Sequence, residues 1–306
     1  MARFLLRRVA LSIFVVLVVT LLVAWAVRLS GDPAIMLAEG SNVTEQDLVN
    51  IRKALGLDRP FSAQYAGFVA GMVTGDMGRS FMGGRQVAGM VAQALPLTML
   101  LAVLSLAVSL MMSIPLGVHA AVHRGGWADQ AIRIVSLVGL SFPNFWLAIM
   151  LVLVFAITLG WLPPSGADSL SGLVMPVATL AVILTATNVR LVRTAMLETL
   201  SAQYVTVARS KGLTEAVVLY KHALRNCAIP LITYIGLQFG GLIGGVVVIE
   251  RVFNWPGMGS LAFDAVASRD YPVLQATVTV LAALIVLVNL LVDLVYGVVD
   301  PRVRAQ

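Results

Sequence analysis

Long apolar segments separated by short polar connections dominate the chain. Segment 9–27 is interrupted only by Ser12 and Thr20, and segment 229–249 carries only three polar residues. Each is long enough to cross a hydrocarbon layer of about 30 Å as a helix. Four further segments follow the same pattern: Leu95–Val118, Ile132–Leu159, Leu173–Thr187 and Ala276–Val292. The pattern predicts an all-α membrane protein with six transmembrane helices.

The composition supports this class. Hydrophobic residues make up 59% of the 306 residues and charged residues 12%, far outside the range of soluble globular proteins. The first apolar segment follows Arg3, Arg7 and Arg8 and ends at an Ala-Trp-Ala triplet, a pattern also found in secretory signals. Its apolar core is longer than that of a signal peptide, so we expect a retained helix.

The distribution of positive charge predicts the orientation, because lysine and arginine accumulate on the cytoplasmic side of membrane proteins. With the N-terminus inside, that side receives most of the 21 lysines and arginines: Arg3, Arg7, Arg8, Arg124, Arg133, Arg190, Arg193, Arg209, Lys211, Lys221, Arg225, Arg302 and Arg304. Both termini are therefore predicted to be cytoplasmic. This asymmetry accounts for the net charge of +6, so no nucleic-acid partner is expected.

We divide the chain into a first transmembrane helix over residues 1–29, an extracytoplasmic helical insertion over 30–94 and a transmembrane core over 95–306. In the insertion, Thr44 and Asp47 indicate the start of one helix and Pro60 the start of another. The insertion either caps the bundle or offers a docking surface to an external partner, and the sequence leaves both open. The core carries a cytoplasmic segment, 197–228, and an external loop, 250–275.

The external loop contains a tight turn, followed by a short predicted helix over 258–268. A re-entrant element beside a substrate path and an ordinary hairpin both fit this pattern. Trp255 also suits an anchor at the membrane interface. The turn residues are Phe253, Asn254, Trp255, Pro256 and Gly257.

Several residues inside the predicted spans break the apolar pattern. Pro115 and Pro143 predict bends in the second and third spans. Glycines in the fifth span, spaced by four, predict the close approach of another helix, and Gln238 makes a polar pathway the alternative. These glycines are Gly236, Gly240 and Gly244, overlapped by Gly241 and Gly245.

Asn289, Asp293 and Tyr296 share one helical face near the inner end of the last span. An acid within a membrane is a functional-site hypothesis by default. Because Asp293 lies close to the cytoplasmic end, we favour a structural hydrogen bond between helices over proton transfer.

A basic, helix-patterned segment separates the fourth and fifth apolar runs. A helical stripe through Leu200 and Tyr204 ends near Gly212, which can adopt the left-handed conformation that terminates helices. Thr214 is the expected N-cap of a second helix, with Glu215 in its first turn. The prediction is a pair of short amphipathic helices hinged at Gly212, which either lie on lipid headgroups or act as a lever in a cytoplasmic partner.

The same segment contains Ala208-Arg209-Ser210-Lys211-Gly212, then His222-Ala223-Leu224-Arg225-Asn226 and Ile229-Pro230. It resembles the cytoplasmic signature loop of ABC-importer permeases, and more narrowly that of the dipeptide, oligopeptide and nickel branch. Further matches are Gly31-Asp32-Pro33, Leu55-Gly56-Leu57-Asp58-Arg59-Pro60, Gly75-Asp76-Met77-Gly78, Ser141-Phe142-Pro143, Arg269-Asp270-Tyr271-Pro272 and Asp300-Pro301-Arg302.

The segment departs from the general importer-permease loop in two features, and these narrow the resemblance to one branch. The general loop begins Glu-Ala-Ala, whereas Thr206-Val207-Ala208 stands here, and Pro230 lies further from Gly212 than usual. Both features are similar to the peptide branch. The resemblance implies that the loop docks in a groove of a cytoplasmic ATPase and couples it to the membrane helices, through Ala208, Arg209, Lys211, Gly212, Thr214, Glu215, His222, Arg225 and Asn226.

The chain carries no recognisable catalytic pattern. A phosphate-binding loop needs Gly-Lys-Ser/Thr, and none of Lys53, Lys211 and Lys221 has that context. Its three histidines form no HExxH pair, and its single cysteine, Cys227, excludes an internal disulfide. We therefore expect neither an enzyme nor a metal cofactor in this chain.

We expect a permease subunit in the bacterial cytoplasmic membrane that imports short peptides, with nickel or glutathione as alternatives within the branch. The resemblance implies a homologous second permease, two ATPase subunits that bind ATP and Mg, an external solute-binding protein and surrounding lipid. Candidates to line the path are Gln238, Gly240, Gly241 and Gly244. The rival hypotheses are a proton-coupled secondary carrier that uses Asp293 and a membrane scaffold without a transport path.

Overall fold

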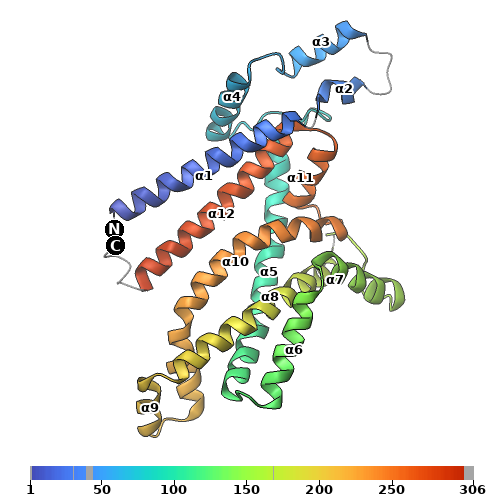
Figure 1. Cartoon of the computed structure of the whole chain (residues 1–306). Helices are drawn as coiled ribbons and strands as arrows, with labels where there is room; N and C mark the ends of the chain where they lie inside the picture. Colours follow the sequence, from blue (N-terminus) through green and yellow to red (C-terminus); the bar gives the residue numbers. More distant parts are fainter. Residues whose placement is uncertain (1, 30, 39–43, 168, 300–306) are drawn as a thin grey trace. The chain divides into compact units, whose positions relative to one another are not determined.

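The computed structural model describes residues 2–29, 31–38, 44–167 and 169–299, and helices account for most of them (Figure 1). The predicted all-α class is confirmed. The α-helices are α1 (Ala2–Leu29), α2 (Pro33–Ala38), α3 (Glu45–Ala54), α4 (Phe61–Thr74), α5 (Val87–Val122), α6 (Trp127–Ser141), α7 (Asn144–Leu151), α8 (Leu170–Leu200), α9 (Gln203–Ser210), α10 (Leu224–Val252), α11 (Met258–Ala267) and α12 (Tyr271–Val299). Two π-helical segments, η1 (Val152–Thr158) and η2 (Val217–Ala223), continue α7 and precede α10.

Five of these helices, α1, α5, α8, α10 and α12, are long and apolar enough to cross a membrane. The predicted third span is not one continuous helix: α6 and the α7–η1 segment meet at an angle of 96°. Counted as one broken span, the pair brings the total to six. The break falls at Phe142–Pro143, where Phe142 is extended because the proline ring disfavours helical conformation in the preceding residue. The bend predicted at Pro143 is therefore confirmed.

The described residues form two compact units. One comprises residues up to 98 together with 256–287, and the other comprises 99–255 together with the chain from 288 onward. The long helices α5 and α12 each contribute to both units.

The first unit contains the insertion. Thr44 caps α3 as predicted: its hydroxyl accepts a hydrogen bond from the Asp47 amide, and the Asp47 carboxylate accepts one from the Thr44 amide. The Thr44 hydroxyl also donates to the Asp47 carboxylate at 2.7 Å, and this hydrogen bond, together with the one from the Thr44 amide, lowers the pKa of Asp47. Pro60 precedes α4 as expected, whereas α2 was not predicted. The core of this unit joins the N-terminal part of α5 to α11 and the start of α12 through Val87, Val91, Ala94, Met258, Ala265, Val273 and Ala276.

One buried acid fixes the loop before α5 within the first unit. Asp270 is 3% exposed and accepts hydrogen bonds from the Ser80 hydroxyl and from the Phe81 amide, the latter at 3.1 Å. The amides of a short turn thus satisfy a carboxylate that would otherwise be costly to bury.

The second unit is built around α8, which packs against α6, α7 and α10 (Figure 1). The glycine face predicted on α10 is occupied in part by α12. A Cβ atom added to Gly236 would lie 2.2 Å from Cγ2 of Val292. The absence of a side chain at Gly236 therefore allows α12 to approach α10 closely.

Replacing Gly236 by valine forces α10 and α12 apart. Overpacking of this kind costs about 1–3 kcal/mol, so the midpoint of thermal unfolding in detergent should fall by several degrees. Gly244→Val on the same helix is the control, since a Cβ there meets nothing within 4 Å. Equal unfolding midpoints for the two variants would contradict the close packing at Gly236.

Candidate coupling site

The basic segment folds as the predicted pair of helices, which we call the elbow (residues 201–223). α8 ends at Leu200, α9 follows, and after a turn at 211–214 the chain reverses into a helix that starts at Glu215. This return helix passes through η2 and runs without a break into α10 (Figure 1). The helix runs through Pro230 without a break, and its part Tyr234–Val252 is the one apolar enough to cross a membrane.

The turn depends on Gly212. Its φ angle is +76°, in the left-handed region that glycine adopts with little strain. The Gly212 amide donates to the carbonyl of Arg209 at 2.9 Å and closes the end of α9. On the other side, the Thr214 carbonyl accepts from the Val218 amide at 3.0 Å, so the return helix starts where the sequence indicated.

The two arms of the elbow pack on each other. Val205 and Ala208 of α9 and Val218 of η2 are buried together, and Leu200 packs against them. Ala208 therefore holds the elbow together and is not part of its surface. The outer side is partly apolar and exposed: Tyr204, Val207, Leu213 and Tyr220 are each between 40% and 54% accessible.

Charged groups surround this apolar surface. Arg209 and Glu215 form an ion pair across the turn, with Nε and Oε1 2.8 Å apart. Lys211, Thr214, Arg225 and Asn226 are exposed, and His222 is half-buried. The Asn226 amide group donates to the His222 carbonyl at 2.8 Å. The predicted coupling residues therefore lie around the turn and along the return helix.

The return helix is anchored to the transmembrane bundle. Its Ala223 and Cys227 are buried in a cluster with Leu231 of α10, Val192, Ala195 and Met196 of α8, and Val118 and Ala121 of α5. The Cys227 thiol, 1% exposed, lies 3.0 Å from the Thr199 hydroxyl. This cluster therefore joins the elbow directly to α8 and α10.

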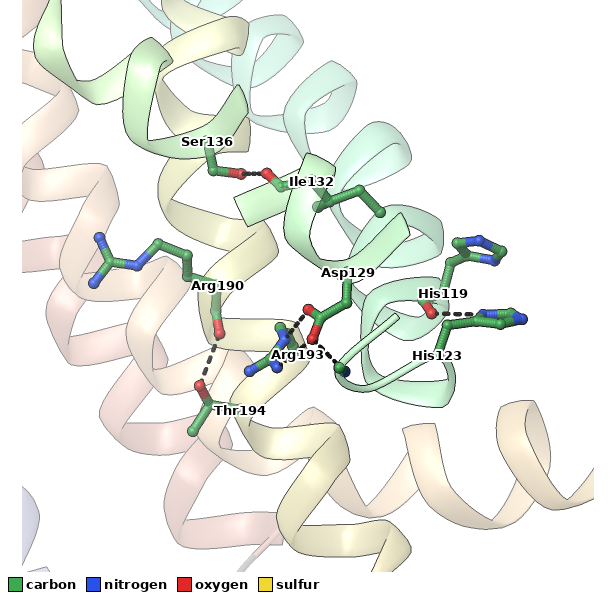
Figure 2. Close-up of polar contacts among 9 residues, drawn as sticks. His119, His123, Asp129, Ile132, Ser136, Arg190, Arg193 and Thr194 are labelled. Atoms are coloured by element: carbon green, nitrogen blue, oxygen red, sulfur yellow. Dashed lines mark hydrogen bonds and ion pairs between the residues drawn. The ribbon is translucent and has the colours of Figure 1, made fainter. Parts of the chain in front are cut away.

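An ion pair that sequence reasoning missed joins α6 to α8 (Figure 2). Arg193 donates two hydrogen bonds to Asp129, from Nε at 2.6 Å and from Nη2 at 2.8 Å. The Gly125 amide donates a third at 2.9 Å. Asp129 is 1% exposed. The available signal was that Asp129 is the single acid between the second and third predicted spans.

Only two of the four residues predicted to line the path border a cavity in the structure. Gln238 and Gly241 line a cavity of about 210 Å³ in the second unit, together with Asn144, Thr187 and Gly245. Gly240 and Gly244 do not line it. Asn144 and Thr187 were not among the predicted site residues, because their contribution depends on the bend before α7 and on the packing of α8.

Within the second unit, Phe253 and Trp255 of the loop predicted to be external are each 1% exposed. The interpretation of Trp255 as a membrane-interface anchor is therefore wrong, because a buried ring cannot contact headgroups. The Phe253 carbonyl accepts from the Gly166 amide at 3.1 Å, and Asn254 has a positive φ of 48°. These contacts fix the start of the loop. In the first unit, Gly257 is buried directly before α11.

Near the end of α12, Asn289 and Asp293 are half-buried, and the side chain of Tyr296 lies outside the described residues. The hydrogen bond expected of Asp293 stays a prediction. Across the ranges that the structure describes, no three His, Cys, Asp or Glu side chains gather where they could hold a metal ion.

One broken pair and five continuous apolar helices among the described residues, with a hinged pair of helices leading into one of them, define the class: a multi-pass membrane protein. The chain belongs to the family of binding-protein-dependent transport system inner membrane components, the permease subunits of ABC importers. The model of that family matches residues 113–305, and the model of the family's N-terminal part matches residues 1–102.

Curated relatives come from the same branch. The glutathione transport system permease protein GsiC of Escherichia coli O6:H1 is 40% identical over 276 residues, which is 90% of each chain. The proteins of the same name from Pectobacterium atrosepticum and Salmonella choleraesuis are 39% and 38% identical over 305 residues, 99% of each chain. The resemblance to the dipeptide, oligopeptide and nickel branch is thereby confirmed.

Solved structures agree on the fold. A chain of the MetNI methionine ABC transporter in an inward-facing conformation matches with a TM-score of 0.61 at 17% identity. The match covers 69% of the present chain and 96% of that chain, and a second crystal form gives a TM-score of 0.58. At this identity the likeness concerns the fold alone.

The two ion pairs should differ in their contribution to stability. Asp129→Asn removes the charge that balances a mostly buried guanidinium, so we expect a loss of about 2–4 kcal/mol in unfolding free energy. Glu215→Gln breaks an exposed pair, worth under about 1 kcal/mol. Thermal unfolding of both variants in one detergent measures the difference. A larger effect at Glu215 would show that Asp129–Arg193 does not hold α6 to α8.

Proposed function

We propose that this permease subunit imports short peptides across the bacterial cytoplasmic membrane and that the elbow couples it to separate ATPase subunits. The observation that carries the proposal is the continuous path from the Gly212 turn through the return helix into α10. A force applied to the elbow would act directly on α10, which lines the cavity beside Gln238.

The proposed orientation places the elbow and both termini in the cytoplasm. This follows from the excess of lysine and arginine beside the elbow and in the connection between α5 and α6. The α2–α4 insertion and α11 then lie outside, where they are available to a solute-binding protein.

The structure of the elbow favours a lever over a helix that merely lies on lipid. Its two arms already bury Val205, Ala208 and Val218 against each other. The aromatic and aliphatic side chains left outside, with arginine and lysine around them, form a surface of the kind enriched at protein interfaces. A groove in a cytoplasmic ATPase is the proposed occupant, and its nucleotide-driven movement would alternate access to the cavity.

The proposed assembly contains a homologous second permease, two ATPase subunits that bind ATP and Mg, and a solute-binding protein. Short peptides are the proposed substrates, and glutathione, itself a peptide, is compatible with the relatives named above. Nickel is the alternative within the branch.

Gly212→Val tests the coupling role. A valine at positive φ is strained by about 1–2 kcal/mol, and the strain comes from the backbone alone because a Cβ there meets nothing within 4 Å. This strain shifts the equilibrium of the turn away from its native conformation by about tenfold, so we expect ATP-dependent uptake to fall by up to that factor. The amount of the subunit in the membrane should stay unchanged.

Gly212→Asn is the matched control, because asparagine tolerates the left-handed region. It should retain most of the uptake. Uptake measured in proteoliposomes that contain the whole assembly decides the outcome, and full ATP-dependent transport by the valine variant would remove the elbow from the mechanism.

A further inference from the structure

The cavity beside Gln238 holds polar groups that the coupling role does not use. We propose that this cavity is where the subunit binds the passing solute, and that it recognises the amide groups of a peptide backbone. The proposal rests on the transport function proposed above and adds a binding site and the chemical class that it selects.

Three transmembrane elements build the cavity. Asn144 is the first residue of α7 after the 96° bend, Thr187 lies in the middle part of α8, and Gln238 lies halfway along α10. Broken helices expose polar groups at membrane depth only where they line a cavity or are buried in protein. The bend at Pro143 therefore places the side-chain amide of Asn144 beside the cavity.

Gln238 carries an unsatisfied hydrogen-bond acceptor beside the cavity. Its Oε1 atom is buried and finds no hydrogen-bond partner among the described residues. A buried acceptor without a donor costs about 1–3 kcal/mol. Rotation of the Gln238 amide toward the cavity would let this oxygen accept a hydrogen bond from a ligand N–H group. The neighbouring Thr187 hydroxyl makes only a long hydrogen bond of 3.4 Å to the Ile183 carbonyl, so it too can bind a ligand.

The lining determines the chemical class. Its polar side chains are two carboxamides and one hydroxyl, and the remaining residues are apolar or glycine: Leu180, Ile183, Leu184, Gly241, Leu242 and Gly245. A transition-metal ion prefers imidazole, thiolate or carboxylate ligands, none of which lines this cavity. Carboxamides pair instead with peptide N–H and C=O groups, which every peptide carries whatever its side chains.

The size of the cavity limits what it contacts. At about 210 Å³ it is smaller than the roughly 300–1,000 Å³ typical of sites that enclose a whole ligand. It therefore holds a short stretch of backbone and leaves the peptide's side chains unselected. Because Gly241 and Gly245 have no side chains, α10 leaves room in the cavity for that stretch of backbone.

Two glycines on α10 provide a matched test. Gly241 lines the cavity and Gly244 does not, yet a Cβ at either position meets nothing within 4 Å. Cysteine is introduced at each position in a Cys227→Ala background, and the assembled transporter is reacted with N-ethylmaleimide. Dialanine at ten times its dissociation constant should slow labelling of Gly241→Cys about tenfold and leave Gly244→Cys unchanged.

Adding Gln238→Leu to the Gly241→Cys variant should weaken dialanine binding about tenfold, so that the same dialanine concentration slows labelling only about twofold. S-methylglutathione should protect as dialanine does, and nickel chloride should not. Protection by nickel alone, or equal effects at both glycines, would overturn the assignment. If dialanine is imported with ATP but never protects position 241, the cavity assignment fails while the proposed function stands.

Discussion

The structure depends on the packing of the return helix against α8. Ala223 and Cys227 are buried with Val192, Ala195 and Met196, at the point where the elbow becomes α10. Small side chains at Ala223 and Cys227 allow the helices to approach closely. Because closely packed interiors transmit strain, this contact is where we expect a movement of the elbow to reach α8 and α10.

Two further contacts make α8 the fixed element of its unit. The Asp129–Arg193 ion pair holds one end of α6 to α8. The other end of α6 leads into the bend at Phe142–Pro143, so α7 starts beside the cavity that Thr187 of α8 and Gln238 of α10 also line. The elbow and the cavity are therefore connected through the same two helices, α8 and α10.

Much of this fold could be predicted from the sequence because its signals are local. Apolar runs of membrane-spanning length marked the spans, and Thr44 and Gly212 marked a helix start and a helix end through the conformations that these residues favour. Pro143 indicated a bend for the same reason. The sequence did not indicate that this bend divides the span into two helices at 96°.

The rest depends on which helices meet, which local patterns do not contain. Asp129 and Arg193 are far apart in the sequence, and nothing in either neighbourhood indicates the other. Trp255 looked like an interface anchor until its burial was known. Two of the four predicted path residues, Gln238 and Gly241, line the cavity. Asn144, which was not predicted, lines it as well because the bend places the start of α7 there.

The central claim is that the elbow contacts an ATP-hydrolysing subunit. A photo-crosslinking amino acid at Tyr204, which is 43% exposed on the elbow, tests it directly in intact cells. We expect an adduct with a cytoplasmic ATPase, and its yield should change when ATP is depleted. The proposed coupling would be contradicted by crosslinking only to lipid, or only to a protein on the external side of the cytoplasmic membrane.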